Sequence, residues 1–260
     1  MPHISLEGKV AIVTGGTRGI GYGIAIELAQ RGAAVLITYV SPGSTKLAQE
    51  LISKIEKFGG KAAAVQADCC SLDSPKLIVD TAVKSFTGNI DILVNNAGIS
   101  EELWLRDCTY DHFERVFQTN VRFPMFLVQA SLPYLSKGGR ILNMSSVAAR
   151  EVELAWKMHT VYSASKAAVE SFTRTWSLEL GQEYGVTVNC INPGPVATEM
   201  WDAMPAETQK ETQKYIDNIP AAPRLATVDD IAQIAAFLCE DGARWITGST
   251  TCANGGAVMV

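Results

Sequence analysis

The sequence has no long apolar run and no cluster of basic residues. Its apolar stretches are far shorter than the roughly 20 residues of a membrane-spanning helix, and residues 1–10 carry neither the basic segment nor the apolar core of a secretory leader. The 22 lysines and arginines are scattered and outnumbered by 27 acidic residues, which argues against nucleic acid or an anionic membrane as partner. We therefore expect a soluble, cytoplasmic protein that acts on a small molecule.

Residues that bind metals or form disulfides are few and unsuitably spaced. The three histidines, His3, His112 and His159, lie far apart in the sequence, and the cysteines form no CxxC pair. We expect no metal site, and we expect the cysteines to be reduced, mostly buried thiols. The six cysteines are Cys69, Cys70, Cys108, Cys190, Cys239 and Cys252.

The sequence does contain a regular alternation of short β-branched runs and longer stretches with helical spacing. Several of the short runs are apolar throughout, as in strands buried on both faces. The alternation predicts an α/β fold with a parallel sheet and helices on both faces. The expected strands are residues 9–14, 33–40, 61–67, 90–96, 139–145 and 186–192, and the expected helices are residues 19–31, 44–58, 74–86, 111–135, 160–183 and 228–240.

Nothing in the chain marks a boundary between domains. No repeat, low-complexity tract or Pro/Gly-rich linker is present, so we expect one domain over residues 1–260. Residues 200–222 interrupt the alternation with a polar stretch of helical character. Such an insertion at a sheet edge is either a mobile lid or a decorated surface loop. A substrate lid would extend over about residues 198–222.

The first expected strand leads into the glycine-rich segment TGGTRGIG, residues 14–21, and then into a helix. Gly15, Gly19 and Gly21 allow a tight turn and a close approach of a pyrophosphate to the helix N-terminus, where free N–H groups favour anions. The spacing G-x-x-x-G-x-G differs from the commoner G-x-G-x-x-G. A dinucleotide site and a glycine turn without ligand are both compatible with this segment.

The end of the second expected strand indicates which dinucleotide is bound. NAD-binding versions of this fold place an acidic residue there, which accepts hydrogen bonds from the ribose 2′-OH. This chain has Thr38, Tyr39, Val40 and Ser41 instead, and Arg18 in the glycine turn could bind a 2′-phosphate. The pattern favours NADP(H) over NAD(H).

Tyr162 and Lys166 are four residues apart in VYSASKAAV, residues 161–169, within an expected helix. Residues at this spacing share a helix face. A nearby ammonium favours phenolate and lowers a tyrosine pKa from its reference of about 10. The pair therefore suggests a proton donor or acceptor, while a surface lysine packed over an ordinary tyrosine is the alternative.

Five motifs occur in order: the glycine turn, DILVNNAG, NMSS, YxxxK and INPGPVAT. Together they resemble the short-chain dehydrogenase/reductase family over about residues 8–256, most closely its 3-oxoacyl carrier-protein reductases and fungal polyhydroxynaphthalene and related ketone reductases. The resemblance implies a doubly wound, Rossmann-type fold with a mostly parallel seven-stranded sheet. It also implies a homo-oligomer, commonly a tetramer with a dimer as the alternative, packed through the helices near 111–135 and 160–183. The apolar C-terminal segment AVMV would otherwise be exposed.

The resemblance assigns catalytic roles to four residues. Tyr162 corresponds to the general acid/base, Lys166 to its electrostatic partner, Ser146 to the serine that orients the carbonyl, and Asn120 to the asparagine that steadies a water chain. Ser146 and Tyr162 are sixteen residues apart, compared with roughly thirteen in the family, so the choice between Ser145 and Ser146 stays open. Arg122 aligns with an arginine near the cofactor, and a structural ion pair is its alternative. The expected cofactor-binding residues are Gly15, Thr17, Arg18, Ile20, Gly21, Tyr39, Asp68, Cys69, Asn96, Ala97, Gly98, Arg122, Tyr162, Lys166, Pro193, Gly194, Val196 and Thr198.

Large side chains gather where the family binds substrate. We expect Trp104, Trp156, His159, Trp201 and Met204 to line a broad aromatic pocket, although they could equally be core or subunit-contact residues. The expected reaction is NADPH-dependent reduction of a bulky cyclic or aromatic ketone to a secondary alcohol, or the reverse. One alternative is 3-oxoacyl thioester reduction in fatty-acid synthesis; another is a non-catalytic NADP-binding scaffold or sensor.

Overall fold

The computed structural model describes residues 5–86, 88–150 and 157–259. Within these residues the chain forms a seven-stranded sheet in the order β3-β2-β1-β4-β5-β6-β7, and every neighbouring pair is parallel. The order reverses direction at β1 and β4, which confirms the expected doubly wound α/β fold. The strands are β1 (Val10–Val13), β2 (Ala34–Tyr39), β3 (Lys61–Gln66), β4 (Ile90–Asn95), β5 (Leu135–Met144), β6 (Thr187–Pro193) and β7 (Thr250–Ala253).

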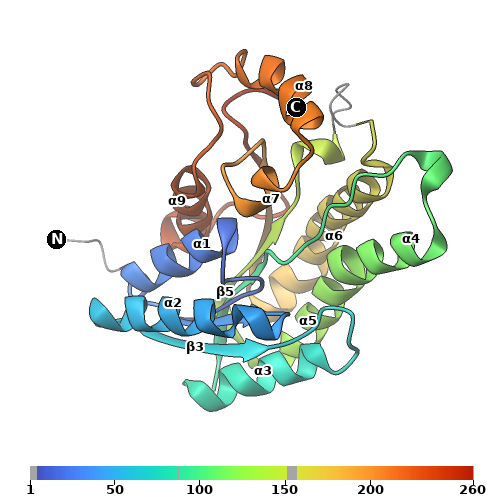
Figure 1. Ribbon diagram of the computed structural model, residues 1–260. Coiled ribbons are helices and arrows are strands. Elements are labelled where there is room, and N and C mark those ends of the chain that lie inside the picture. Colours follow the sequence, from blue (N-terminus) through green and yellow to red (C-terminus); the bar gives the residue numbers. More distant parts are fainter. Residues whose placement is uncertain (1–4, 87, 151–156, 260) are drawn as a thin grey trace.

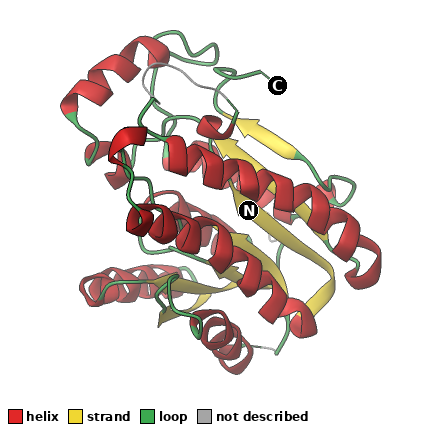
Figure 2. Cartoon of the chain, turned by 90° about the vertical axis from the view of Figure 1, so that its right-hand side faces the viewer, coloured by secondary structure: helices red, strands yellow, loops and turns green. Residues whose placement is uncertain are grey.

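Helices cover both faces of the sheet, as Figures 1 and 2 show. One face is packed by α1 (Gly19–Gln30), α2 (Thr45–Lys57) and α9 (Val228–Cys239). The other is packed by α3 (Ser74–Ser85), α5 (Phe123–Ser131) and α6 (Thr160–Tyr184), with α4 (Tyr110–Phe117) beside α6. Two further helices, α7 (Glu199–Asp202) and α8 (Ala206–Ile216), follow β6; α8 lies at the top of Figure 1, and α7 lies below it.

The apolar strands explain why two helical layers are needed. In β1, Ala11 and Val13 belong to the core beneath α1, α2 and α9, whereas Ile12 belongs to the core beneath α3, α5 and α6. Successive strand residues point to opposite faces, so a strand without polar positions must be covered on both sides. Fully burying each Ile or Leu contributes roughly 1.5–3 kcal/mol.

The helix expected over residues 111–135 is not regular. It divides into α4, a π-helical turn over Gln118–Arg122, α5 and a 3₁₀ turn over Leu132–Tyr134. Pro124 contributes to the break because it lacks an N–H group for the preceding turn. The π turn carries Asn120 toward the sheet edge, consistent with the frequent occurrence of such turns at functional sites.

The polar stretch 200–222 is helical in part, as expected. Thr198 caps α7, its hydroxyl accepting from Trp201 N, and α8 follows after three residues. Strand β7 was missed from the sequence because TTCA is short and half-buried. Across the described residues, no helix combines the length and the apolar character needed to cross a bilayer.

Candidate active site

The glycine turn joins β1 to α1 at the carboxyl edge of the sheet. Gly15 and Gly19 have φ angles of +66° and +53°, a region that L residues with side chains rarely adopt. A Cβ atom at Gly21 would lie 2.4 Å from the Gly15 carbonyl oxygen, so this position admits no side chain. Thr38 holds the turn from β2, its hydroxyl accepting from Gly15 N at 3.1 Å.

The first turn of α1 is suited to an anion. Arg18 is the N-cap residue, its side chain makes no capping hydrogen bond, and the first turn contains no acidic residue. Unsatisfied N–H groups and the helix dipole favour a phosphate at such a position. The Arg18 residue is exposed, so its guanidinium is accessible from solvent.

The loop after β4 packs against this turn. Asn96 Nδ2 donates to Thr14 O at 2.8 Å, and the backbone N–H groups of Asn96 and Ala97 donate to Thr14 Oγ1 at 3.0 Å each. A Cβ atom at Gly98 would lie 3.3 Å from both Asn120 Oδ1 and Lys166 Nζ. The absence of a side chain at Gly98 therefore lets the loop after β4 pack closely against Asn120 and Lys166.

Tyr162 and Lys166 lie on adjacent turns of α6, as their spacing predicts, but the expected effect on the tyrosine is wrong. The Lys166 ammonium lies 5.7 Å from the Tyr162 ring centroid and donates to Met144 O at 2.7 Å. Burial raises the pKa of Tyr162, and a hydrogen bond with Ser146 lowers it by less. Burial also lowers the pKa of Lys166 to about 8. Desolvation, and not the lysine charge, therefore dominates the acidity of the phenol.

The structure distinguishes the two serines after β5. Ser145 is buried, and its hydroxyl donates to Lys166 O at 3.3 Å and Glu170 Oε1 at 3.1 Å. Ser146 is partly exposed and forms the hydrogen bond with Tyr162. Ser146 is thus the serine beside the phenol, despite the longer spacing in the sequence.

Asn120 is fixed by three hydrogen bonds from the π-helical turn. Its Nδ2 donates to Ile99 O at 2.9 Å and Ser165 Oγ at 3.0 Å, while its Oδ1 accepts from Ile99 N at 2.9 Å. These bonds link the loop after β4 to α6. The four expected catalytic residues are therefore brought to one edge of the sheet.

The comparisons with known proteins agree with this geometry. A family model described as "Enoyl-(Acyl carrier protein) reductase" matches residues 15–258. The chain is 50 % identical over 263 residues to the short-chain dehydrogenase/reductase FrzI of a Cladobotryum species, an alignment covering 100 % of this chain and 99 % of that protein. The chain belongs to the short-chain dehydrogenase/reductase family. This confirms the expected family and its class of oxidoreductase enzymes.

Two further relatives extend the comparison. The hydroxynaphthalene reductase-like protein Arp2 of Metarhizium robertsii is 38 % identical, with 98 % of this chain and 96 % of that protein aligned. A blue fluorescent protein from a metagenomic library, solved in complex with NADPH, has a TM-score of 0.90 and 37 % identity, covering 98 % of this chain and 100 % of the other. The short-chain dehydrogenase/reductase fold therefore extends across nearly the whole chain.

The remaining expected cofactor-binding residues surround the same edge. Tyr39 ends β2, its hydroxyl accepting from Thr45 Oγ1 at 3.4 Å, and exposed Asp68 follows β3. Cys69 is held as a thiol because burial raises its pKa to about 12. Pro193 ends β6, and Gly194, Val196 and Thr198 follow it. Thr17 is buried, and Ile20 packs against the core.

Arg122 has a role that neither sequence interpretation included. Its guanidinium donates to Cys70 O at 2.6 Å and forms no ion pair with a described residue. Arg122 therefore ties the π-helical turn to the loop after β3; the alternative interpretation, a structural ion pair, is wrong for the described residues, and its place near the cofactor stays a prediction.

One of the expected substrate-pocket residues, His159, lies beside the ring of Tyr162. Its ring meets the Tyr162 ring edge-on, with centroids 5.9 Å apart. Trp104 is 39 % exposed and lies beneath Lys157, whose Nζ is 5.4 Å from the indole centroid. Trp156 lies outside the described residues.

The helices after β6 join this side of the site. Trp201 and Met204 carbonyls accept from Gln209 Nε2 at 2.9 and 3.3 Å. Thr208 on α8 donates to Glu102 Oε2 at 3.0 Å, which connects α8 to the loop after β4. Glu102 and Thr208 belong to no motif, so this contact could not be predicted from local sequence patterns.

Two observations define the surroundings of the site. A pocket of about 320 Å³ lies between Gly194, Arg224 and Asn254, but its lining includes none of the four expected catalytic residues. In the described part of the chain, no three His, Cys, Asp or Glu side chains are arranged to hold a metal ion.

Proposed function

We propose that the protein is an NADPH-dependent ketone reductase that forms a secondary alcohol, or catalyses the reverse reaction, on a bulky cyclic or aromatic substrate of secondary metabolism. The observation that carries the proposal is the contact of Ser146 with Tyr162, beside Lys166. The name of the hydroxynaphthalene reductase-like relative supports the substrate class.

The dinucleotide would be held by the glycine turn, the loop after β4 and the segment after β6. The NADPH in the structural relative and the absence of an acidic residue at the end of β2 favour NADP(H) over NAD(H). Arg18 would pair with the 2′-phosphate. When bound, NADPH supplies the hydride.

Tyr162 would act as the proton donor in reduction. Because burial raises its pKa, the phenol is protonated at neutral pH and can donate to an oxygen that develops negative charge. Ser146 donates a hydrogen bond to the same oxygen, an effect that is strongest where water is scarce. Lys166 provides positive charge nearby, and Asn120 fixes the surrounding backbone.

The substrate would bind between His159, Trp104 and the helices after β6. Trp201 and Met204 would complete a broad apolar wall, and residues 198–222 would act as the lid. The comparisons do not favour 3-oxoacyl thioester reduction, and the chain has no basic cluster to receive an acidic carrier protein. A non-catalytic scaffold would have no physical need for Asn120 with the three other catalytic residues.

We also propose a single-domain, cytoplasmic homo-oligomer, either dimer or tetramer. Phe113 on α4, Phe126 on α5 and Leu178 on α6 are 43, 42 and 83 % exposed, an apolar surface suited to a second copy. Met259 in the C-terminal AVMV segment is 79 % exposed. Small-molecule substrate and cofactor are the other expected partners.

The test follows nicotinamide absorbance while the purified protein is offered NADPH or NADH with cyclic, aromatic and thioester-linked ketones. We expect turnover of a cyclic or aromatic ketone with NADPH, reduced by about 100-fold or more in Ser146→Ala. Turnover of thioesters alone, or no turnover of any ketone, would contradict the proposal.

A further inference from the structure

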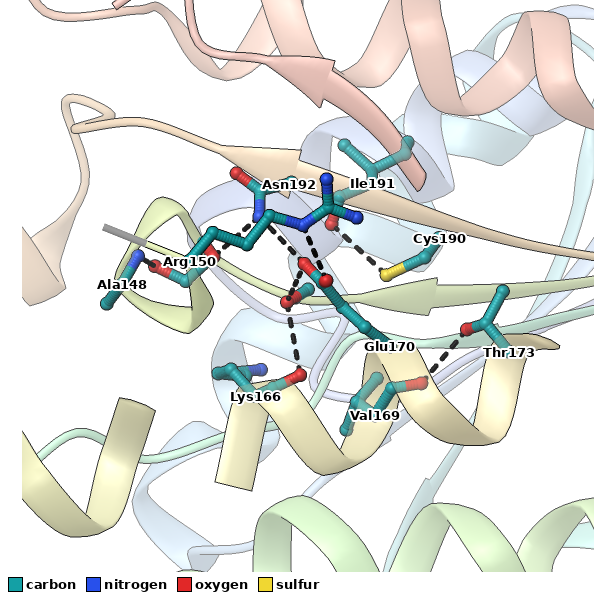
Figure 3. Close-up of polar contacts among 11 residues, drawn as sticks. Ala148, Arg150, Lys166, Val169, Glu170, Thr173, Cys190, Ile191 and Asn192 are labelled. Carbon is teal, nitrogen blue, oxygen red and sulfur yellow. Dashed lines mark hydrogen bonds and ion pairs between the residues drawn. The ribbon is translucent and has the colours of Figure 1, made fainter. Parts of the chain in front are cut away.

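A buried carboxylate lies one helical turn beyond Lys166. Glu170 is 5 % exposed, and its carboxylate is at the centre of the polar network in Figure 3. Three side chains donate to it: Ser145 Oγ at 3.1 Å, Asn192 Nδ2 at 2.9 Å and Arg150 Nε at 2.7 Å. Burying a charge is unfavourable unless such donors compensate.

Asn192 connects this carboxylate to the catalytic serine. Its Nδ2 donates to Glu170 Oε1 at 2.9 Å and also to Ser146 O at 2.7 Å. Its Oδ1 is buried and has no hydrogen-bond partner among the described residues. The orientation of the Asn192 amide is therefore determined by the two acceptors of its Nδ2 group, Glu170 Oε1 and Ser146 O. A movement of the Glu170 carboxylate would move the amide and, with it, the peptide group of Ser146.

Ser145 fixes the preceding residue in a similar way. Its hydroxyl contacts both Glu170 and the carbonyl of Lys166, while its N–H donates to Ile191 O at 2.8 Å. Ser146 is thus flanked by two contacts that depend on one carboxylate. The same contacts link α6, which carries Tyr162, to the ends of β5 and β6.

We propose that Glu170, with its charge partner Arg150, is a positioning residue that fixes the backbone at Ser146 and so directs the Ser146 hydroxyl at Tyr162. The inference rests on the proposed function for its catalytic consequence. A buried ion pair adds little net stability, because desolvation offsets the attraction. The convergence of these donors on the Glu170 carboxylate therefore matters chiefly for the geometry at Ser146.

The pH dependence of catalysis should reveal this geometry. The hydrogen bond from Ser146 lowers the pKa of Tyr162, so its loss raises that pKa. In ketone reduction Tyr162 donates a proton, and the rate falls as pH rises through its pKa; in alcohol oxidation it accepts one, and the rate rises. Displacing Ser146 therefore shifts both limbs of the pH–rate profile, the falling one for reduction and the rising one for oxidation, to higher pH.

The experiment compares Glu170→Gln with Glu27→Gln. Glu27 also pairs with an arginine, Arg31, at 2.8 Å and with 14 % of its side chain exposed, but it lies at the opposite end of α1 from the glycine turn. Single-turnover rates are measured against pH in both directions. We expect Glu170→Gln to lower the rate by about tenfold or more, with KM for NADPH changed by less than about twofold, and to move both limbs to higher pH.

Glu27→Gln should retain the wild-type rates and pH limbs. A Glu170→Gln profile that matches this control would overturn the inference. Crystal structures of wild type and Glu170→Gln give a second reading that does not depend on turnover. A displaced Ser146 supports the positioning role, and an unmoved Ser146 contradicts it.

Two Arg150 variants test the same contact if the Glu170 variant does not fold. Arg150→Met should change the rates and the pH limbs in the same direction, and Arg150→Lys should restore most of the activity because it keeps the charge. Equal activity in Arg150→Met and wild type would contradict the inference. If wild type reduces no ketone, the proposed function fails, and the crystal structures alone decide the positioning role.

Discussion

The glycine turn after β1 and the proposed catalytic group, whose residues lie on the π-helical turn, after β5 and on α6, share one edge of the sheet, but different forces hold them. The turn depends on the absence of side chains: a Cβ at Gly21 would meet the Gly15 carbonyl oxygen at 2.4 Å. The catalytic group depends on polar side chains that hydrogen-bond to the backbone. Lys166 Nζ donates to Met144 O, and Asn120 Oδ1 accepts from Ile99 N. We infer that the turn is sensitive to added volume, and the catalytic group to lost partners.

Adding one methyl group to the turn should have the largest effect. Gly21→Ala forces the backbone apart, so we expect NADPH affinity, measured by fluorescence titration, to fall by about 100-fold, with a loss of about 1–3 kcal/mol in the free energy of unfolding. Gly43→Ala is the matched control, because its Cβ would meet only Ser41 Oγ at 3.8 Å. Equal NADPH affinity in the two variants would argue against the steric account.

Removing the lysine charge should have a pH-dependent effect on stability. Burial lowers the folded pKa of Lys166 from 10.5 to about 8, so the unfolded chain binds more protons between these values and wild type gains stability as pH rises. Relative to Lys166→Met, the wild-type free energy of unfolding should therefore increase by about 3 kcal/mol from pH 7 to 10.5.

Urea denaturation of both proteins at several pH values measures this difference, and other titrating groups cancel between them. A difference that is constant with pH would show that the ammonium is not desolvated in the folded protein. Lys166→Met should also be inactive in ketone reduction, whatever its stability.

A smaller effect is expected at the cofactor-facing surface of the turn. Arg18→Ala removes the proposed partner of the 2′-phosphate, so KM for NADPH should rise by about tenfold or more while KM for NADH stays nearly unchanged. Steady-state kinetics with both cofactors test this expectation. An equal change in both KM values would place Arg18 outside 2′-phosphate recognition.

The two regions also differ in how far the sequence predicts them. The glycine turn, the parallel sheet and the stacking of Tyr162 over Lys166 follow from local patterns, because glycine spacing and apolar periodicity act over short distances. The contacts among Glu170, Asn192 and Arg150 join separate parts of the chain, and although Asn192 lies in the INPGPVAT motif, no motif links it to Glu170 or Arg150.

The pKa of Tyr162 shows the same limitation. A spacing of four residues places the lysine near the phenol, but whether burial or charge dominates depends on the packing around both groups. In the structure, burial dominates for Tyr162 and for Lys166. Arg122 is a further case, since its contact with Cys70 O requires the π-helical turn that the sequence pattern does not reveal.

The central claim, that the turn binds the cofactor and the phenol of Tyr162 transfers the proton, is tested most directly by Tyr162→Phe. The variant removes one hydroxyl from the catalytic group and leaves the turn intact. We predict that NADPH binds with nearly wild-type affinity while single-turnover ketone reduction falls by about 100-fold or more. Reduction at the wild-type rate, with NADPH bound, would contradict the account.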